Sequence, residues 1–435
     1  MTLANTADQW WRPEPPAAGS ATAGHAEATP LDTGTSSVAY AAFVAFTFVL
    51  LLAPQNLFPF LGSLRIVLLM GAIAIVAHVR DRWELGLPLA RPGREARFAA
   101  ALLVWALVGW PFSLWPGGTL ALVLDLYLKA LIVFWLISNL VDTLPRLRGM
   151  AWTLTWLTVA LALVGISNYL SGVFGPGQDR RILGYDAGLT RNPNDLALML
   201  NLIIPIAVSL LLSTTGALVR TVLVAALAIQ VTAVILTFSR AGFLTLAATL
   251  GLYGLRLLGR PSRGFVLAGV AVAALSLPFL PAGYAERLLT LRAIDADSTG
   301  SAQARWGGTV AAIENMASHP ILGAGLGMDI LALNETVGPT WRAVHNTYLE
   351  YGVDLGVPGL VLFLLLLWSS WKSARAARRL GGLELASLAE GIEISLVAFA
   401  IAALFHPAAY QFYFYYIAGL AVAARTVASR EAAAA

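Results

Sequence analysis

The sequence contains no cysteine. The chain therefore has no disulfide framework, no thiolate nucleophile and no cysteine ligand for a metal. Charged residues are also scarce, at 12% of the 435 residues, whereas hydrophobic residues make up 58%. Together with a mean hydropathy of +0.74, this composition excludes an ordinary soluble globular protein and indicates a chain embedded in a lipid bilayer.

Long continuous apolar runs dominate the remaining sequence. An α-helix needs roughly 20 apolar residues to cross the bilayer, whereas a barrel strand alternates over about 10 residues. Because the runs are continuous, we predict an all-α polytopic membrane protein with about 12 transmembrane helices. The segments bracketing "FSRAG" and "FHPAAY" could each form one broken helix, which leaves this count open by one or two. The predicted spans are 38–54, 58–79, 97–114, 119–141, 149–169, 195–213, 217–237, 241–257, 264–282, 345–370, 385–404 and 408–427.

The distribution of basic residues predicts the topology. Short loops rich in Lys and Arg remain on the cytoplasmic side. With both termini inside, the strongly basic loops near residues 80–97, 146–148, 256–263 and 372–379 all become cytoplasmic.

The first 37 residues are rich in Ala, Pro, Gly and Thr and lack a basic stretch followed by an apolar core. We therefore expect a disordered cytoplasmic tail rather than a cleaved signal peptide.

Two outer segments exceed the usual length of a connection, and long loops of this kind are usually functional or disordered. The first is a periplasmic loop, 170–194. The second, 283–344, contains Trp306, Val310, Ile313 and Met316 at helical spacing, with Gly323 as a stop signal, and predicts a folded helical cap. The predicted organisation is a tail, 1–37; nine spans, 38–282; the cap, 283–344; three spans, 345–427; and a second tail, 428–435.

Several arginines fall on the predicted outer side, where the topology rule does not require them. Arg191 and Asn194 precede a span in "LTRNPNDLALML", where a helix N-terminus attracts anions, although a simple cap would explain the asparagine. Arg240, in "LTFSRAGFL", has no acidic residue nearby in sequence. Such an arginine must face a polar cavity, a partner or an anion, or else extend to the lipid surface. Further candidates are Arg305 in the cap and Arg180 and Arg181 in "GQDRRILG".

The stretch "AVHNTYLEYGVDLGVPG" places polar residues just before an apolar run. If a helix begins near His345, then Asn346, Glu350 and Asp354 lie on one face of it, which must point into the bundle or an outer cavity. Arginines bind phosphate oxygens in a bidentate manner, and a histidine that titrates near neutrality can take a proton from a hydroxyl. The combination suits a site for a doubly charged phosphate group. Tyr348 completes the candidate substrate-binding residues.

Other polar and aromatic features have simpler interpretations. Asp125 and Lys129, four residues apart, indicate an intramembrane ion pair. The aromatic run at 410–416 is typical of an interfacial belt, with stacking on a sugar or polyprenyl chain as the alternative. We expect His406 to lie outside the site. The "DAD" at 295–297 is only a weak metal-binding match, and we predict neither a metal nor a cofactor.

The segments "TRNPNDLA", "TFSRAGFL", "RWGGTVAAIENMASHPILGAGLG" and "HNTYLEYGVDLGVPGL" occur in this order between apolar spans. Over roughly residues 185–370, the sequence resembles the O-antigen ligase and O-antigen polymerase superfamily of bacterial envelope glycosyltransferases. The resemblance implies an inner-membrane enzyme of the GT-C class with a periplasmic active site. Such enzymes use a glycan linked to undecaprenyl diphosphate, without a metal. By match to the family motifs, Arg191 and Arg240 would hold the diphosphate and His345 would activate the acceptor hydroxyl.

The acceptor distinguishes the members of this superfamily. A ligase transfers the glycan to a sugar of the lipid A core, whereas a polymerase transfers it to a growing repeat unit. We favour an inverting ligase, with a polymerase or a protein-glycosylating relative as alternatives.

Outside the enzyme class, a secondary transporter would show related halves and charges near the bilayer midplane. A scaffold that binds other envelope proteins is the third possibility. Membrane lipids are expected partners, and nucleic acid is not.

Overall fold

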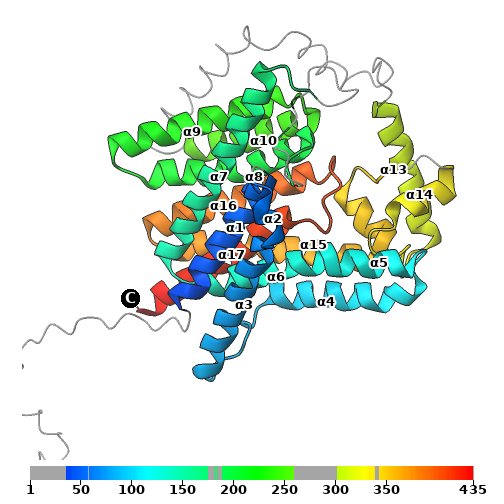
Figure 1. Ribbon diagram of the computed structural model, residues 1–435, viewed down its shortest axis with the longest axis horizontal. Coiled ribbons are helices and arrows are strands. Elements are labelled where there is room, and N and C mark those ends of the chain that lie inside the picture. The colour runs from blue at the N-terminus through cyan, green and yellow to red at the C-terminus, as the bar shows by residue number, and fades with distance from the viewer. Residues whose placement is uncertain are drawn as a thin grey trace, which may run out of the picture. The chain divides into compact units, whose positions relative to one another are not determined.

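A computed structural model describes residues 36–258, apart from 57, 175–181, 183 and 185–188, and residues 301–434, apart from 339–341 (Figure 1). Several predictions lie outside these described residues. They are nearly all of the N-terminal tail, the span at 264–282, the "DAD" at 295–297, and Arg180 and Arg181. Within the described part, the only extended pairing is one isolated bridge between Phe174 and Ile182.

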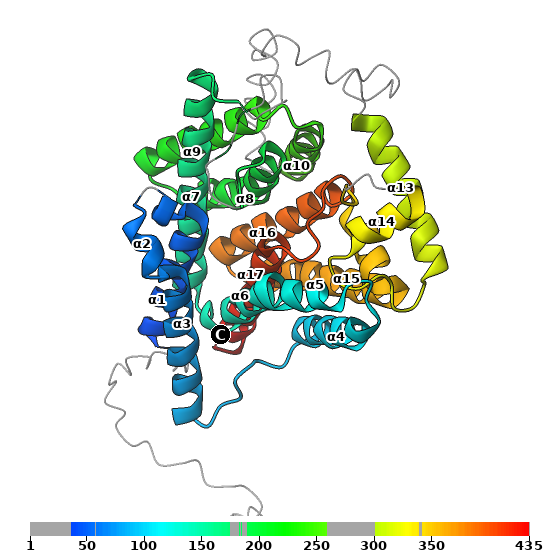
Figure 2. The same cartoon turned by 45° about the vertical axis from the view of Figure 1, so that its right-hand side comes forward.

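The described chain forms a helical bundle. Its first half contains α1 (Ser37–Leu52), α2 (Phe60–Ser63), α3 (Ile66–Glu84), α4 (Arg94–Gly109), α5 (Pro116–Leu122), α6 (Leu128–Leu140), α7 (Leu144–Leu170), α8 (Pro193–Ser213), α9 (Ala217–Leu236) and α10 (Arg240–Leu258). Its second half contains α13 (Ser301–Ser318), α14 (Asp329–Val337), α15 (Thr347–Leu380), α16 (Leu383–Ala402) and α17 (Phe412–Ala434). Figure 2 shows α1 beside α3, and α4 beside α15.

The all-helical prediction is confirmed for the described residues, but the count of twelve spans is not. Eight described helical segments are long and apolar enough to cross a membrane. The predicted span 38–54 is a helix of only 16 residues. The predicted span 58–79 is interrupted at Arg65, whose φ of 45° lies in the left-handed region. Helix α17 continues to Ala434 and therefore includes nearly all of the predicted tail at 428–435.

The basic segments gather at one end of the bundle, and α13 and α14 lie at the other. Arg91, Arg146 and Arg430 all pair with Asp142 after the end of α6. Ser373, near the end of α15, donates to Glu95 in the first turn of α4. At the opposite end of α4, Leu114 N–H donates to the Ala324 carbonyl, which follows α13. This arrangement gives the bundle a basic end and a cap end.

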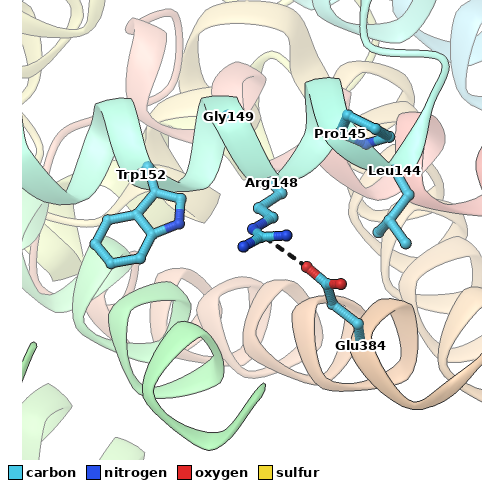
Figure 3. Close-up of a pocket in the computed structure, with 6 residues that line it drawn as sticks. All are labelled: Leu144, Pro145, Arg148, Gly149, Trp152 and Glu384. Carbon is cyan, nitrogen blue, oxygen red and sulfur yellow. Dashed lines mark ion pairs between the residues drawn. The ribbon is translucent and has the colours of Figure 1, made fainter. Parts of the chain in front are cut away.

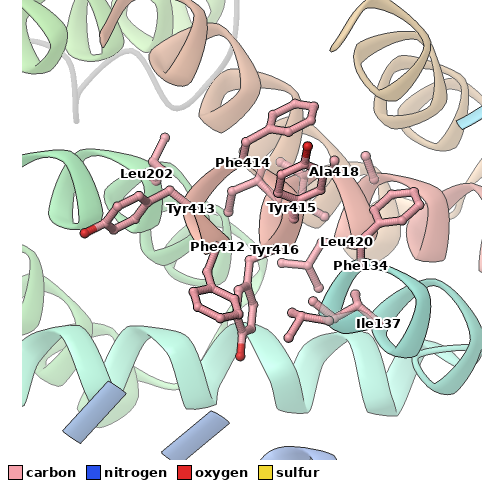
Figure 4. Close-up of a cluster of buried hydrophobic side chains, with 14 of the residues drawn as sticks. Phe134, Ile137, Leu202, Phe412, Tyr413, Phe414, Tyr415, Tyr416, Ala418 and Leu420 are labelled. Carbon is pink, nitrogen blue, oxygen red and sulfur yellow. The ribbon is translucent and has the colours of Figure 1, made fainter. Parts of the chain in front are cut away.

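Helix α17 lies in the core, and the interpretation of residues 410–416 as an interfacial belt is therefore wrong. Phe414 and Tyr415 are fully buried, and Phe414 packs edge-on against Phe363 of α15 at 5.4 Å between ring centroids. In Figure 4, Phe134 and Ile137 of α6 approach this helix from another side. The same aromatic composition would suit a membrane interface, and only the neighbouring helices distinguish the two cases.

The predicted cap helix exists as α13, which packs against α14 and α15. Of the apolar residues at helical spacing, Trp306, Val310 and Ile313 are 64%, 40% and 49% exposed. Ala311 and Ala312 are buried instead. The small alanines allow close approach to the neighbouring helices, so the bulky apolar side chains lie on the outer face.

Candidate active site

The segment "GVDLGVPG" forms a kink in α15 on which the loop after α13 docks. Gly356 has a φ of +67°, and a Cβ there would lie 2.2 Å from the carbonyl oxygen of Ile321. Ala324 N–H donates to the Val353 carbonyl at 2.8 Å, and Gly327 N–H donates to Asp354 Oδ2 at 2.7 Å. Glycine at the kink is required both by its φ and by the close approach. The Asp354 carboxylate fixes the cap loop to α15.

The backbone on both sides of His345 is held in place. Val344 N–H donates to Asp329 Oδ2 at 2.7 Å, and Asn346 caps α15 by accepting from the Tyr348 and Leu349 N–H groups. Burial raises the pKa of Asp329, which is at the start of α14. His345 is therefore presented from a turn between the cap and the first turn of α15.

Positive groups surround the His345 imidazole. His345 is exposed at the surface of the bundle, but the surrounding protein still disfavours the charged imidazole, and this desolvation is the main reason that its pKa is lowered to about 4. The charge of Arg305 lowers the pKa further, followed by His406 and Arg342. His345 is therefore neutral near pH 7 and can accept a proton, and Arg305 of α13 acts on it electrostatically.

The segments "TRNPND" and "FSRAG" meet where α8 and α10 begin. Ser239 Oγ donates to Asn194 Oδ1 at 2.9 Å and accepts from Gly242 N–H at 3.1 Å. Asn201 of α8 donates to the Gly242 carbonyl at 3.0 Å. These contacts place Arg240, the first residue of α10, beside the N-terminal turn of α8 that follows Arg191. Arg191 is exposed and Arg240 is partly buried.

The turn that precedes Arg240 has an unusual backbone conformation. Phe238 has a φ of 50°, which is rare for an aromatic residue. Its ring stacks on Tyr169 at 6.5 Å between centroids. Such backbone strain often occurs at functional sites, and here it sets the direction in which α10 begins.

His406 connects α8 with α15, although the sequence led us to expect it outside the site. Its Nε2 lies 2.7 Å from Asp195 Oδ1, and its carbonyl accepts from Thr347 Oγ1 at 2.6 Å. His406 is buried. Asp195 and His406 are 211 residues apart in sequence. The only local signal was a histidine between two spans, which is why the sequence did not predict this contact.

The other candidates on α15 contact its neighbours in the fold. Glu350 Oε2 accepts from Ala409 N–H at 3.1 Å, and Tyr348 OH donates to the Ala400 carbonyl at 2.7 Å. The Glu350 contact holds the segment between α16 and α17 against the start of α15, and the Tyr348 contact holds α16 there. Their role toward a substrate remains a prediction.

Asp125 and Lys129 form the predicted ion pair, at 3.5 Å. Their side chains are 81% and 46% exposed on the bundle, so they do not line a buried transport path.

Among the described residues, no three His, Asp or Glu side chains are grouped as metal ligands.

Comparison with known proteins identifies one family. Residues 223–364 match the family model described as O-Antigen ligase. The matched segment begins in α9, includes Arg240, Arg305 and His345, and ends in α15. No curated protein matches the chain.

Proposed function

The chain carries an O-antigen ligase family domain at residues 223–364, and on this premise we propose that it is a membrane glycosyltransferase with an undecaprenyl-diphosphate-linked donor. The proposed acceptor is a sugar hydroxyl of the lipid A core. The reaction takes place on the periplasmic face, at the cap end of the bundle. Both chain termini are then cytoplasmic, and the enzyme belongs to the GT-C class.

The meeting of three helix N-termini is the observation that carries this proposal. The first turns of α8 and α10 are joined through Asn194 and Ser239, and those of α8 and α15 through Asp195 and His406. Helix N-termini carry partial positive charge and bind phosphate groups. The ends of these helices therefore provide an environment for a diphosphate.

Arg191 and Arg240 are the proposed donor ligands. They flank the joined N-termini of α8 and α10, and their guanidinium groups remain charged at all relevant pH values. When the bond between the anomeric carbon and the diphosphate oxygen breaks, negative charge grows on that oxygen. Loss of one preorganised donor of this kind typically costs about 10² to 10³ in rate.

His345 is the proposed general base. The acceptor oxygen attacks the anomeric carbon from the face opposite the diphosphate, its proton passes to the imidazole, and undecaprenyl diphosphate leaves with the bonding electrons. The anomeric centre is inverted. A bound diphosphate would offset the positive charges of Arg305 and Arg342, so donor binding would raise the His345 pKa from about 4 toward neutrality. The base would thus become stronger once the donor is in place. No step requires a metal.

A transfer assay with purified protein in lipid nanodiscs tests this function. Wild-type protein is given an undecaprenyl-diphosphate-linked glycan with a lipid A core, a second glycan repeat unit or an acceptor protein. We expect product with the lipid A core, and we expect His345→Ala and Arg240→Ala to lower the rate by about 10² or more. Lys129→Ala is the control, because its side chain is 46% exposed and pairs with Asp125, which has no proposed role in transfer. Product with only the repeat unit would instead identify a polymerase, and near-normal rates in both variants would remove these residues from the mechanism.

A further inference from the structure

A cavity lies at the basic end of the bundle, far along the helices from His345. It has a volume of about 1180 Å³ and lies between the segment that leads into α4 and the helices α4, α6 and α17. Cavities that hold small molecules are typically 300–1,000 Å³. The arginines that line it are Arg91, Arg94, Arg97, Arg425 and Arg430.

The lining of this cavity has an excess of positive charge. Among the described residues that line it, Glu95 is the one acidic residue; it is buried and accepts a hydrogen bond from Ser373 at 2.7 Å. Arg91 and Arg430 share one carboxylate, Asp142, at 2.8 and 3.2 Å. Asp142 also pairs with Arg146 at 2.9 Å. One acidic group therefore serves three arginines, and the remaining positive charge is available to an anion.

Arg94 and Arg97 are exposed at the N-terminus of α4 and make no ion pair among the described residues. Cations are unfavourable at this end of a helix, because the macrodipole is positive there. The sequence thus keeps two arginines where they do not stabilise the helix. Both the side chains and the dipole attract a negative group at the mouth of the cavity.

The inner part of the cavity is apolar. Leu103 of α4, Leu131 and Phe134 of α6, and Val422 of α17 line it. Leu103 follows Arg94 by nine helical residues, which corresponds to roughly 13 Å along the axis. The cavity therefore combines a cationic mouth with an apolar interior, and this combination fits an amphiphile with an anionic head group.

A smaller pocket near α7 and α16 provides a contrast. It has a volume of about 480 Å³ and contains Arg148 and Trp152. Figure 3 shows Arg148 directed toward Glu384, and the two side chains approach to 3.4 Å. The carboxylate neutralises the arginine there, so this pocket has no comparable attraction for an anion.

We propose that the cavity between α4, α6 and α17 binds an anionic phospholipid from the leaflet opposite the cap. Its phosphate contacts Arg94, Arg97 and Arg425, and one acyl chain extends along Leu103 and Leu131. Basic pockets between membrane helices bind such head groups. A free phosphate ion would contact the mouth only and would leave the apolar interior unused.

Native mass spectrometry of the full-length protein with phosphatidylglycerol and phosphatidylcholine tests the proposal. We expect preferential retention of phosphatidylglycerol by the wild type. The double variant Arg94→Ala with Arg97→Ala should bind it about 30-fold more weakly, at about 1 kcal/mol for each arginine near the lipid surface. Arg148→Ala is the matched control. It removes an arginine at the basic end of the bundle whose charge Glu384 already pairs, and this variant should bind phosphatidylglycerol as the wild type does.

A second variant separates a lipid from a free anion. Leu103→Trp fills the apolar interior without changing the charge at the mouth. We expect it to weaken phosphatidylglycerol binding while the arginine mouth remains intact. Equal binding of the two lipids by the wild type would overturn the proposal, and so would displacement of phosphatidylglycerol by millimolar inorganic phosphate.

Discussion

His406 shows how one side chain can join segments that are distant in sequence. It contacts Asp195 at the start of α8, while its backbone accepts from Thr347 at the start of α15. The proposed donor ligands are near the first of these sites and the proposed base is near the second. We therefore propose that His406 positions the site and does not itself react with the substrate.

We expect His406→Ala to destabilise the protein by about 1–3 kcal/mol, because the partly buried Asp195 carboxylate loses its partner. The midpoint of thermal unfolding in detergent would measure the loss. The related change Asp195→Asn keeps a hydrogen-bonding oxygen and should cost less. An unfolding midpoint equal to that of the wild type in His406→Ala would contradict the positioning role.

The pH dependence of the transfer rate should reflect the protonated and the neutral state of the His345 imidazole. The base works only when its imidazole is neutral, so activity must fall as the pH drops below its pKa. For kcat/KM, which reports the free enzyme, this acidic limb should lie near pH 4. For kcat, which reports the donor complex, the limb should lie at a higher pH because the diphosphate raises the pKa. Transfer rates measured from pH 3.5 to 8 would show whether the acidic limb of kcat lies at a higher pH than that of kcat/KM. Residual activity measured at pH 7 would show that the protein survives each incubation.

At the scale of the element, α15 combines a cap, a kink and a membrane span. The kink at Gly356 lets the loop after α13 contact the helix backbone directly. This contact could not be predicted from the sequence, because a loop that docks on a helix leaves no periodic pattern. The spans at α8, α9 and α16 were predictable, because hydropathy over a window of about 20 residues is a local property.

Gly356→Ala should lower the stability of α15 and of the cap together. The left-handed φ alone costs about 1–2 kcal/mol for alanine, and contact with the Ile321 carbonyl adds to this cost. Gly251→Ala in α10 is a matched control, because a Cβ there meets no atom within 4 Å. The control should leave stability unchanged or raise it by up to about 1 kcal/mol. Equal unfolding midpoints for the two variants would refute the role assigned to the kink.

At the scale of the whole molecule, the described bundle separates a site end from a basic end. The positions of Arg191, Arg240 and His345 could be predicted from local motifs. Their connection through Ser239, Asp195 and His406 could not, since it depends on how distant helices pack. Burial of the aromatic run in α17 was missed for the same reason. The sequence shows that a side chain is aromatic, whereas its burial depends on which helices pack around it.

Asp142 is the main link among the segments at the basic end. Asp142→Asn would leave Arg91, Arg146 and Arg430 close together without their shared carboxylate. We expect a loss of about 3 kcal/mol, at the low end for a broken buried pair because the arginines are partly solvated. Glu84→Gln, which affects an exposed pair with Arg80, should change stability by less than about 1 kcal/mol. Chemical unfolding of both variants in the same detergent would show whether Asp142→Asn lowers the free energy of unfolding more than Glu84→Gln does.

The docking of the loop at 319–327 on α15 restricts how substrates reach His345. The loop is bonded to Val353, Asp354 and Val357, and it also accepts a bond from Leu114. A lid that swung outward would have to break all these bonds in each catalytic cycle. We therefore expect this loop to stay docked on α15 during turnover. Two substrates with lipid tails would then enter sideways from the membrane, each through a gap between helices.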